Sequence, residues 1–87
     1  MAQNPPYMYS VYVIQSESHG TRYIGSTQDV QARLREHNFG KCRYTSGRRP
    51  WRLVRVEEFN TRSEAMKRER FLKTGKGRAW LDELLSN

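Results

Sequence analysis

The sequence predicts an α+β fold, in which a three-stranded antiparallel sheet is flanked by helices in the order β-β-α-β-α-α. Three observations predict it: two strand-like segments lie close together near the N-terminus, a third follows residue 50, and two helical segments end the chain. Strands joined by a short turn pair as an antiparallel hairpin, and helices then cover the sheet that the hairpin begins.

The first strand is predicted over about residues 8–15, which are rich in aromatic and β-branched side chains. It is apolar on both faces, which indicates a central strand. A polar connection containing Gly20 leads to a second strand at 21–26, and the third strand is predicted at 51–59. Pro5 and Pro6 cannot continue a regular element, so we expect residues 1–7 to be a flexible tail and 8–87 to be one domain.

A first helix is predicted over about 28–37, with Ser26 or Thr27 as its N-cap and Asp29 in its first turn. Residues 39–50 indicate a loop. Thr61 and Glu64 form a capping box, which predicts a second helix to about residue 73. The segment 74–77 should break it, and a last helix with an apolar stripe is predicted over 78–85.

The composition narrows the class of protein. The chain has 87 residues, 16 Lys+Arg against 9 Asp+Glu, and a formal net charge of +7. So basic a small domain indicates a polyanionic partner such as nucleic acid. The single cysteine, Cys42, excludes an internal disulfide and a cysteine-built zinc site. With no signal peptide and no apolar run long enough to cross a membrane, we expect a cytoplasmic protein without membrane contact.

Polar side chains intrude on the apolar faces of both main helices. In the second helix, Glu69 lies about 40° from Ala65, inside the apolar arc. A carboxylate aimed there is costly unless it is paired or binds a cation, and a salt bridge to an arginine is the structural alternative. In the first helix, Arg33 and His37 are spaced i, i+4 and form one ridge beside the apolar stripe; a structural or solvated histidine is the alternative there.

The strands add phenols to this set. Tyr9 and Tyr12 face opposite sides of the first strand, and Tyr23 lies in the second, where core filling is the alternative role of each tyrosine. Gly25 would permit close approach of a helix or a ligand. Tyrosine, arginine, histidine and glutamate suit phosphodiester hydrolysis: a carboxylate holds a divalent cation, a guanidinium binds phosphate oxygens, and a phenol or imidazole moves the proton.

Two basic runs flank these residues, at 41–55 and 67–78, with Tyr44 and Trp51 interleaved in the first. Twelve arginines against four lysines favour phosphate binding over a merely solvated surface. Aromatic side chains among them could stack on unpaired bases. The predicted nucleic-acid-binding residues are Lys41, Arg43, Tyr44, Arg48, Arg49, Arg52 and Lys73.

The residues resemble the GIY-YIG nuclease superfamily over about residues 8–73, and are most similar to small stand-alone YhbQ-like members and Slx-type nuclease domains. The first motif falls on Ser10, Val11 and Tyr12, where only the tyrosine is kept, and the second falls on Tyr23, Ile24 and Gly25 intact. The arginine, histidine and glutamate of the family fall on Arg33, His37 and Glu69. Ser26 stands where UvrC-type and restriction-type members carry a lysine, and Slx-type enzymes have a cysteine-rich domain that this chain lacks.

This resemblance implies a metal-dependent DNA endonuclease with one Mg²⁺ or Mn²⁺ ion on Glu69 and a catalytic set of Tyr12, Tyr23, Arg33, His37 and Glu69. Tyr12 would lie near the nucleophilic water and Arg33 would stabilise the phosphate. The general base is left open among Tyr12, Tyr23 and His37.

Two other functions remain alternatives: a non-catalytic nucleic-acid-binding module with this fold, and a small RNA-binding or ribosome-associated protein in which Glu69 is salt-bridged to Arg33. One such domain has little surface for base readout. We therefore expect weak sequence preference, or selectivity from DNA structure such as branches and flaps, or from a partner protein.

Overall fold

The computed structural model describes residues 8–86, so the predicted tail at 1–7 lies outside the described residues. In chain order the elements are β1 (Tyr9–Ser16), β2 (Arg22–Thr27), α1 (Val30–Asn38), a 3-10 turn η1 (Ser46–Arg48), β3 (Trp51–Phe59), α2 (Arg62–Leu72) and α3 (Gly75–Leu85). The predicted class and order are confirmed, and η1 lies within the predicted loop. Between residues 8 and 86, no helix is long and apolar enough to span a bilayer.

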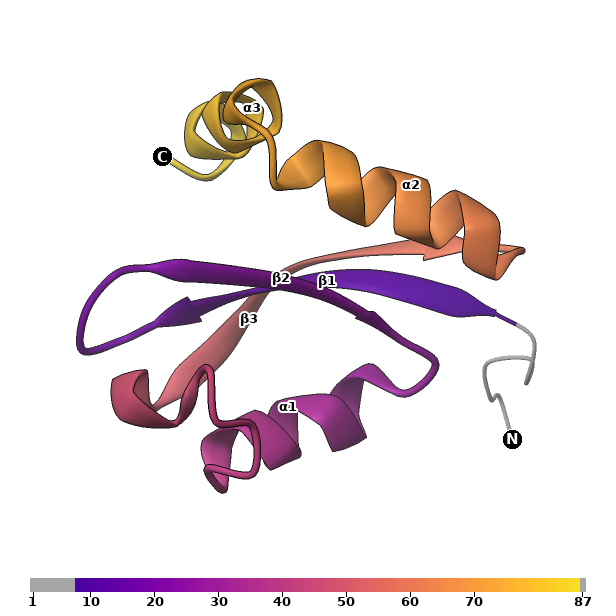
Figure 1. Ribbon diagram of the computed structural model, residues 1–87. Helices are drawn as coiled ribbons and strands as arrows, with labels where there is room; N and C mark the ends of the chain where they lie inside the picture. Colours follow the sequence, from indigo (N-terminus) through magenta and orange to yellow (C-terminus); the bar gives the residue numbers. More distant parts are fainter. Residues whose placement is uncertain (1–7, 87) are drawn as a thin grey trace.

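The sheet has the order β2-β1-β3, with both pairings antiparallel, so β1 is the central strand as predicted. Helices α2 and α3 lie on one face of it and α1 lies on the other (Figure 1). Val11 and Val13 pack with Leu72 and Leu81 under α2 and α3. Tyr12 and Ile14 pack on the α1 face. Side chains alternate along β1, so this one strand supplies both halves of the core.

The N-cap of α1 differs from the prediction. The helix begins at Val30, and the Asp29 carboxylate accepts a hydrogen bond from the Ala32 amide at 3.0 Å. The Thr27 hydroxyl instead accepts from the amide of Asp29 at 3.1 Å. The carboxylate is the better cap because it also carries the negative charge that a helix N-terminus favours. In α2 the predicted cap is confirmed, since the Thr61 hydroxyl accepts from the Glu64 amide at 3.1 Å.

The predicted break at 74–77 is in fact the start of α3. Thr74 is its N-cap and accepts from the Gly77 amide at 3.1 Å. A Cβ atom on Gly77 would lie 2.1 Å from the Phe71 carbonyl oxygen and 2.6 Å from the Leu72 Cα. The first turn of α3 therefore packs directly on the end of α2, and the absence of a side chain on Gly77 makes that contact sterically possible.

This contact predicts opposite effects for two glycines in one helical turn. Gly77→Ala should lower the free energy of unfolding by about 1–3 kcal/mol, because the backbone of α2 would have to move. Gly75→Ala, where an added Cβ meets nothing within 4 Å, should raise it by up to about 1 kcal/mol. Urea unfolding of both variants measures the difference, and equal effects of the two substitutions would contradict the close contact.

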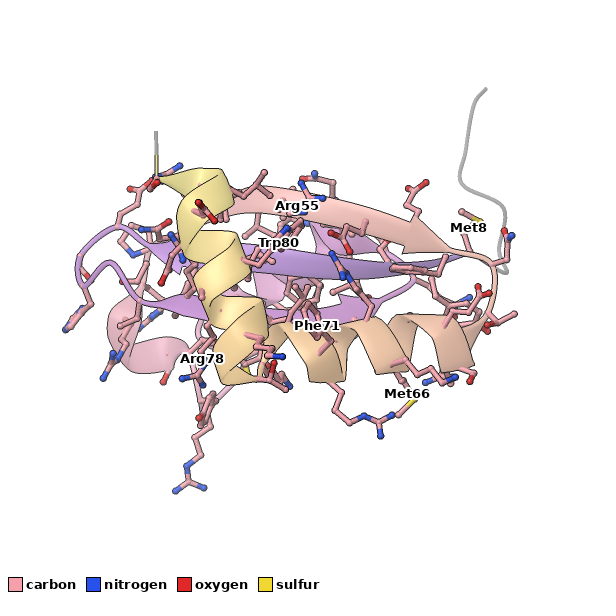
Figure 2. The ribbon with its side chains drawn as sticks, turned by 90° about the horizontal axis from the view of Figure 1, so that it is seen from above. Met8, Arg55, Met66, Phe71, Arg78 and Trp80 are labelled. Atoms are coloured by element: carbon pink, nitrogen blue, oxygen red, sulfur yellow. The ribbon has the colours of Figure 1, made fainter. Side chains whose placement is uncertain are left out.

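A cluster on the α2 and α3 side, next to β3, accounts for part of the basic runs. The guanidinium groups of Arg55 and Arg68 both lie against the Trp80 ring, 5.1 Å and 4.9 Å from its centroid. Figure 2 shows Trp80 on α3 next to Arg55. Both arginines also donate to Glu57, whose pKa is lowered chiefly by the hydrogen bond from Arg68. These two arginines serve packing, since their charges are already paired.

Candidate active site at the outer edge of strand β2

The phenols of Tyr12 and Tyr23 lie on the same face of the sheet. Tyr12 is paired with Gly25 across the hairpin, and Ile14 is paired with Tyr23. The two pairs are separated by two residues on each strand, so both phenols point the same way. A Cβ atom on Gly25 would lie 2.6 Å from the Tyr12 hydroxyl. We expected Gly25 to admit a helix or a ligand; the group that it admits is the Tyr12 phenol, which crosses over β2.

A chain of buried hydrogen bonds begins at this phenol. The Tyr12 hydroxyl lies 2.9 Å from His37 Nε2, and His37 Nδ1 lies 2.7 Å from Thr45 Oγ1. All three residues are 1% exposed. Arg33 also acts on the Tyr12 hydroxyl, whose pKa its side chain lowers by hydrogen bonding, and about half of the Arg33 side chain is exposed. Arg33 therefore connects the buried chain to the surface.

The environment keeps both members of the Tyr12–His37 pair uncharged. Burial raises the pKa of Tyr12 to about 12, although the hydrogen bond from Arg33 opposes that rise. Burial lowers the pKa of His37, and the positive charge of Arg33 lowers it further. At neutral pH the pair therefore consists of a phenol and a neutral imidazole, the forms that can pass a proton between them.

Tyr23 has the more accessible phenol. Its ring packs edge-on against His37, with centroids 5.1 Å apart. Its hydroxyl is solvent-accessible and has no hydrogen-bond partner among the described residues. Burial raises its pKa, and the charges of Lys73, Glu69 and Arg33 also act on it. Tyr23 therefore lies within electrostatic reach of side chains from α1 and from α2, on both sides of the sheet.

Glu69 reaches β2 from the α2 side. Its Oε1 accepts a hydrogen bond from Ser26 at 2.8 Å, and its Oε2 lies 2.7 Å from Lys73 Nζ. The expected position of Glu69 on the inner arc of its helix is confirmed, because its side chain is 22% exposed. The alternative of a Glu69–Arg33 salt bridge is wrong, since Arg33 pairs with Glu36 at 3.0 Å. Successive side chains of a strand point to opposite faces, so Gly25 and Ser26 meet Tyr12 and Glu69 on opposite sides of β2.

Two cavities border this edge. Ser26 and Arg33 both line a cavity of about 240 Å³, so the hydroxyl that holds Glu69 and the guanidinium border one space. A second cavity of about 700 Å³ runs along β2, and its lining includes Tyr23, Tyr44, Lys73 and Arg78. The Tyr44 ring lies 5.9 Å from that of Tyr23 and is 82% exposed.

Residues 8–86 contain no cluster of three or more histidine, cysteine or acidic side chains that could hold a metal ion. A metal ion at this edge would therefore have a single carboxylate as its protein ligand. This suits Mg²⁺, which keeps several of its waters and commonly binds one or two carboxylates together with substrate phosphate. Glu69 fits that role, because it is partly exposed and oriented by Ser26, and its Lys73 partner is about half exposed.

The predicted nucleic-acid-binding residues Lys41, Arg43, Tyr44, Arg48, Arg49, Arg52 and Lys73 are all exposed. Tyr44 and Lys73 border the larger cavity. The prediction that Trp51 also interleaves for stacking is wrong. Trp51 is 5% exposed, and its indole nitrogen donates to the Thr45 carbonyl at 2.9 Å. Asn38 holds the backbone of Trp51 at both its amide and its carbonyl, which closes the loop between α1 and β3.

Comparison with known proteins identifies the family. The GIY-YIG catalytic domain matches residues 8–80. The chain belongs to the GIY-YIG family. It is 52% identical over 63 residues to a UPF0213 protein of Halobacterium salinarum, a match that covers 71% of this chain and 80% of that one. Family membership places the protein in a superfamily of nucleases.

Two further relatives extend the comparison. A UPF0213 protein of Staphylococcus aureus is 46% identical over 65 residues, which cover 74% of this chain and 78% of that protein. The solution NMR structure of a UPF0213 protein from Bacillus halodurans has a TM-score of 0.55 and 34% identity, and the match covers 90% of this chain and 85% of that one. The GIY-YIG fold of this protein is thus shared with a solved relative.

Sequence reasoning missed two residues of the site. Ser26 was predicted only as a possible helix N-cap and as the residue that replaces the family lysine, yet its hydroxyl orients Glu69. No role was predicted for Thr45, because hydroxyl residues are common in loops for reasons of turn geometry. No local pattern could have shown that its side chain is buried against His37.

Proposed function

We propose that residues 8–87 act as a divalent-metal-dependent endonuclease that hydrolyses phosphodiester bonds in DNA, with weak sequence preference or selectivity for branched or flap structures. The observation that carries this proposal is the shared cavity of Ser26 and Arg33, because Ser26 holds Glu69 and Arg33 contacts Tyr12. An acid, a guanidinium and a neutral phenol–imidazole pair thus lie about the same edge strand, and these are the groups that phosphodiester hydrolysis needs.

In this proposal each side chain has one task. Arg33 binds the non-bridging oxygens of the scissile phosphate, to which its planar guanidinium is matched. The Tyr12–His37 pair takes the proton of the attacking water. The Tyr23 hydroxyl donates a hydrogen bond to the phosphate. Glu69 would hold the Mg²⁺ or Mn²⁺ ion, which when bound polarises the phosphoryl group and stabilises its charge.

The cavity along β2 would receive the strand next to the cut. Tyr44 presents an exposed ring in its lining, which also includes Lys73 and Arg78. A base that stacks on Tyr44 must be unpaired, so this arrangement favours substrates in which a strand leaves the duplex. Few side chains are positioned here for base readout, which agrees with weak sequence preference.

A substrate panel tests the proposal. Purified protein is incubated with labelled duplex, single-stranded, flap and branched DNA, in Mg²⁺, in Mn²⁺ and in chelator. We expect cleavage only with a metal ion, and faster cleavage of substrates with an unpaired strand. Salt-sensitive binding of these DNAs without cleavage of any would instead support the non-catalytic module, and full activity in chelator would refute the metal requirement.

A further inference from the structure

Thr45 occupies an unusual place for a loop hydroxyl. It is 1% exposed, and its Oγ1 lies 2.7 Å from His37 Nδ1 and 3.3 Å from the Cys42 carbonyl oxygen. Its own carbonyl oxygen accepts from the Trp51 indole at 2.9 Å. The backbone and the side chain of Thr45 are therefore both held, and its hydroxyl lies directly behind His37 as seen from Tyr12.

Counting hydrogens decides the direction of this chain. The hydroxyls of Tyr12 and Thr45 carry one hydrogen each, and a neutral imidazole carries one N–H. If His37 carries its hydrogen on Nδ1, every link has one donor and one acceptor: Tyr12 donates to Nε2, Nδ1 donates to Thr45, and Thr45 donates to the Cys42 carbonyl. The Tyr12 oxygen remains free to accept from Arg33.

The opposite tautomer leaves groups unsatisfied. With the hydrogen on Nε2, His37 would donate to the Tyr12 oxygen, and the buried Tyr12 hydrogen would have no acceptor among the described residues. Thr45 would turn its hydrogen to Nδ1 and away from the Cys42 carbonyl. An unpaired hydroxyl in a buried position is costly, so the Nδ1–H form is favoured.

We propose that Thr45 is a positioning residue that fixes His37 in its Nδ1–H tautomer, so that the bare Nε2 faces the Tyr12 hydroxyl. The importance of Thr45 for catalysis rests on the proposed function, whereas the assignment of the tautomer rests only on the hydrogen bonds around His37. In the proposed reaction, Tyr12 gives its proton to Nε2 while its oxygen takes a proton from the attacking water. The resulting hydroxide attacks phosphorus while the bond from phosphorus to one bridging oxygen breaks, and the leaving oxygen takes a proton from solvent water. The imidazolium keeps its Nδ1–H directed at Thr45, which orients it as the partner of the histidine does in other histidine-based sites.

The tautomer can be measured without any cleavage assay. Long-range ¹H–¹⁵N correlation spectra of histidine-labelled protein, recorded above the ordinary pKa of histidine, distinguish a protonated from a bare ring nitrogen. The chain has two histidines, and exposed His19 serves as the internal reference. We expect His37 to show Nδ1–H and a bare Nε2. An Nε2–H signature for His37 in the unmodified protein would overturn the proposal.

Two variants complete the test. Thr45→Ser keeps the hydroxyl and should keep both the His37 signature and the cleavage rate. Thr45→Val keeps the shape, and its His37 should shift toward Nε2–H, with kcat reduced about ten- to a hundredfold and KM for DNA unchanged. An unchanged signature in folded Thr45→Val would refute the role. If Thr45→Val does not fold, the spectra of the unmodified protein and of Thr45→Ser still decide the tautomer. If the protein cleaves no DNA, the proposed function is refuted while the tautomer is still decided by the spectra.

Discussion

Glu69→Gln should reduce metal-dependent DNA cleavage by about a thousandfold or more. Glutamine can still accept the hydrogen bond from Ser26, but it has no charge with which to bind a divalent ion, and the loss corresponds to several kcal/mol of transition-state stabilisation. Thermal stability should change little, because a partly exposed pair such as Glu69–Lys73 contributes under about 1 kcal/mol. Single-turnover cleavage with excess enzyme is the measurement.

Glu64→Gln is the matched control for this experiment. Glu64 lies in the first turn of the same helix and is exposed. The control should cleave DNA at the unmodified rate. If Glu69→Gln were equally active, the carboxylate would not hold the ion and the proposed metal site would be wrong.

Arg33→Ala should reduce cleavage by about a hundred- to a thousandfold, because it removes the charged donor nearest to the buried phenol. Arg33→Lys should recover part of the rate, since lysine restores the charge without the two-pronged contact. Arg35→Ala, an exposed position on the same helix, is the control and should remain active.

The same substitution should move the acid limb of the pH–rate profile. Burial and then the charge of Arg33 lower the pKa of His37, so removing that charge lets the pKa rise. Protonated His37 cannot accept a proton from Tyr12, and the activity of Arg33→Ala should therefore begin to fall at a higher pH than that of the unmodified protein. A profile with an unmoved acid limb would show that His37 is not the proton acceptor.

The sequence by itself predicted the layout of the sheet and one half of the site. Apolar residues on both faces of 8–15 predicted a central strand, and the helical angle of Glu69 placed its carboxylate on the inner side of α2. Such patterns are local: a period of two or 3.6 residues reports which face of one element is buried, and the burial of that face follows.

Tertiary structure alone decided which side chains meet. The hairpin register places the Tyr12 phenol over Gly25, and the hydrogen bond from Ser26 holds Glu69 at the same edge of β2. The closed loop after α1 buries Thr45 between its hydrogen-bond partners His37 and Trp51. These contacts join residues from different elements, up to 43 positions apart. They depend on strand register and loop closure, which no periodic pattern in one segment encodes.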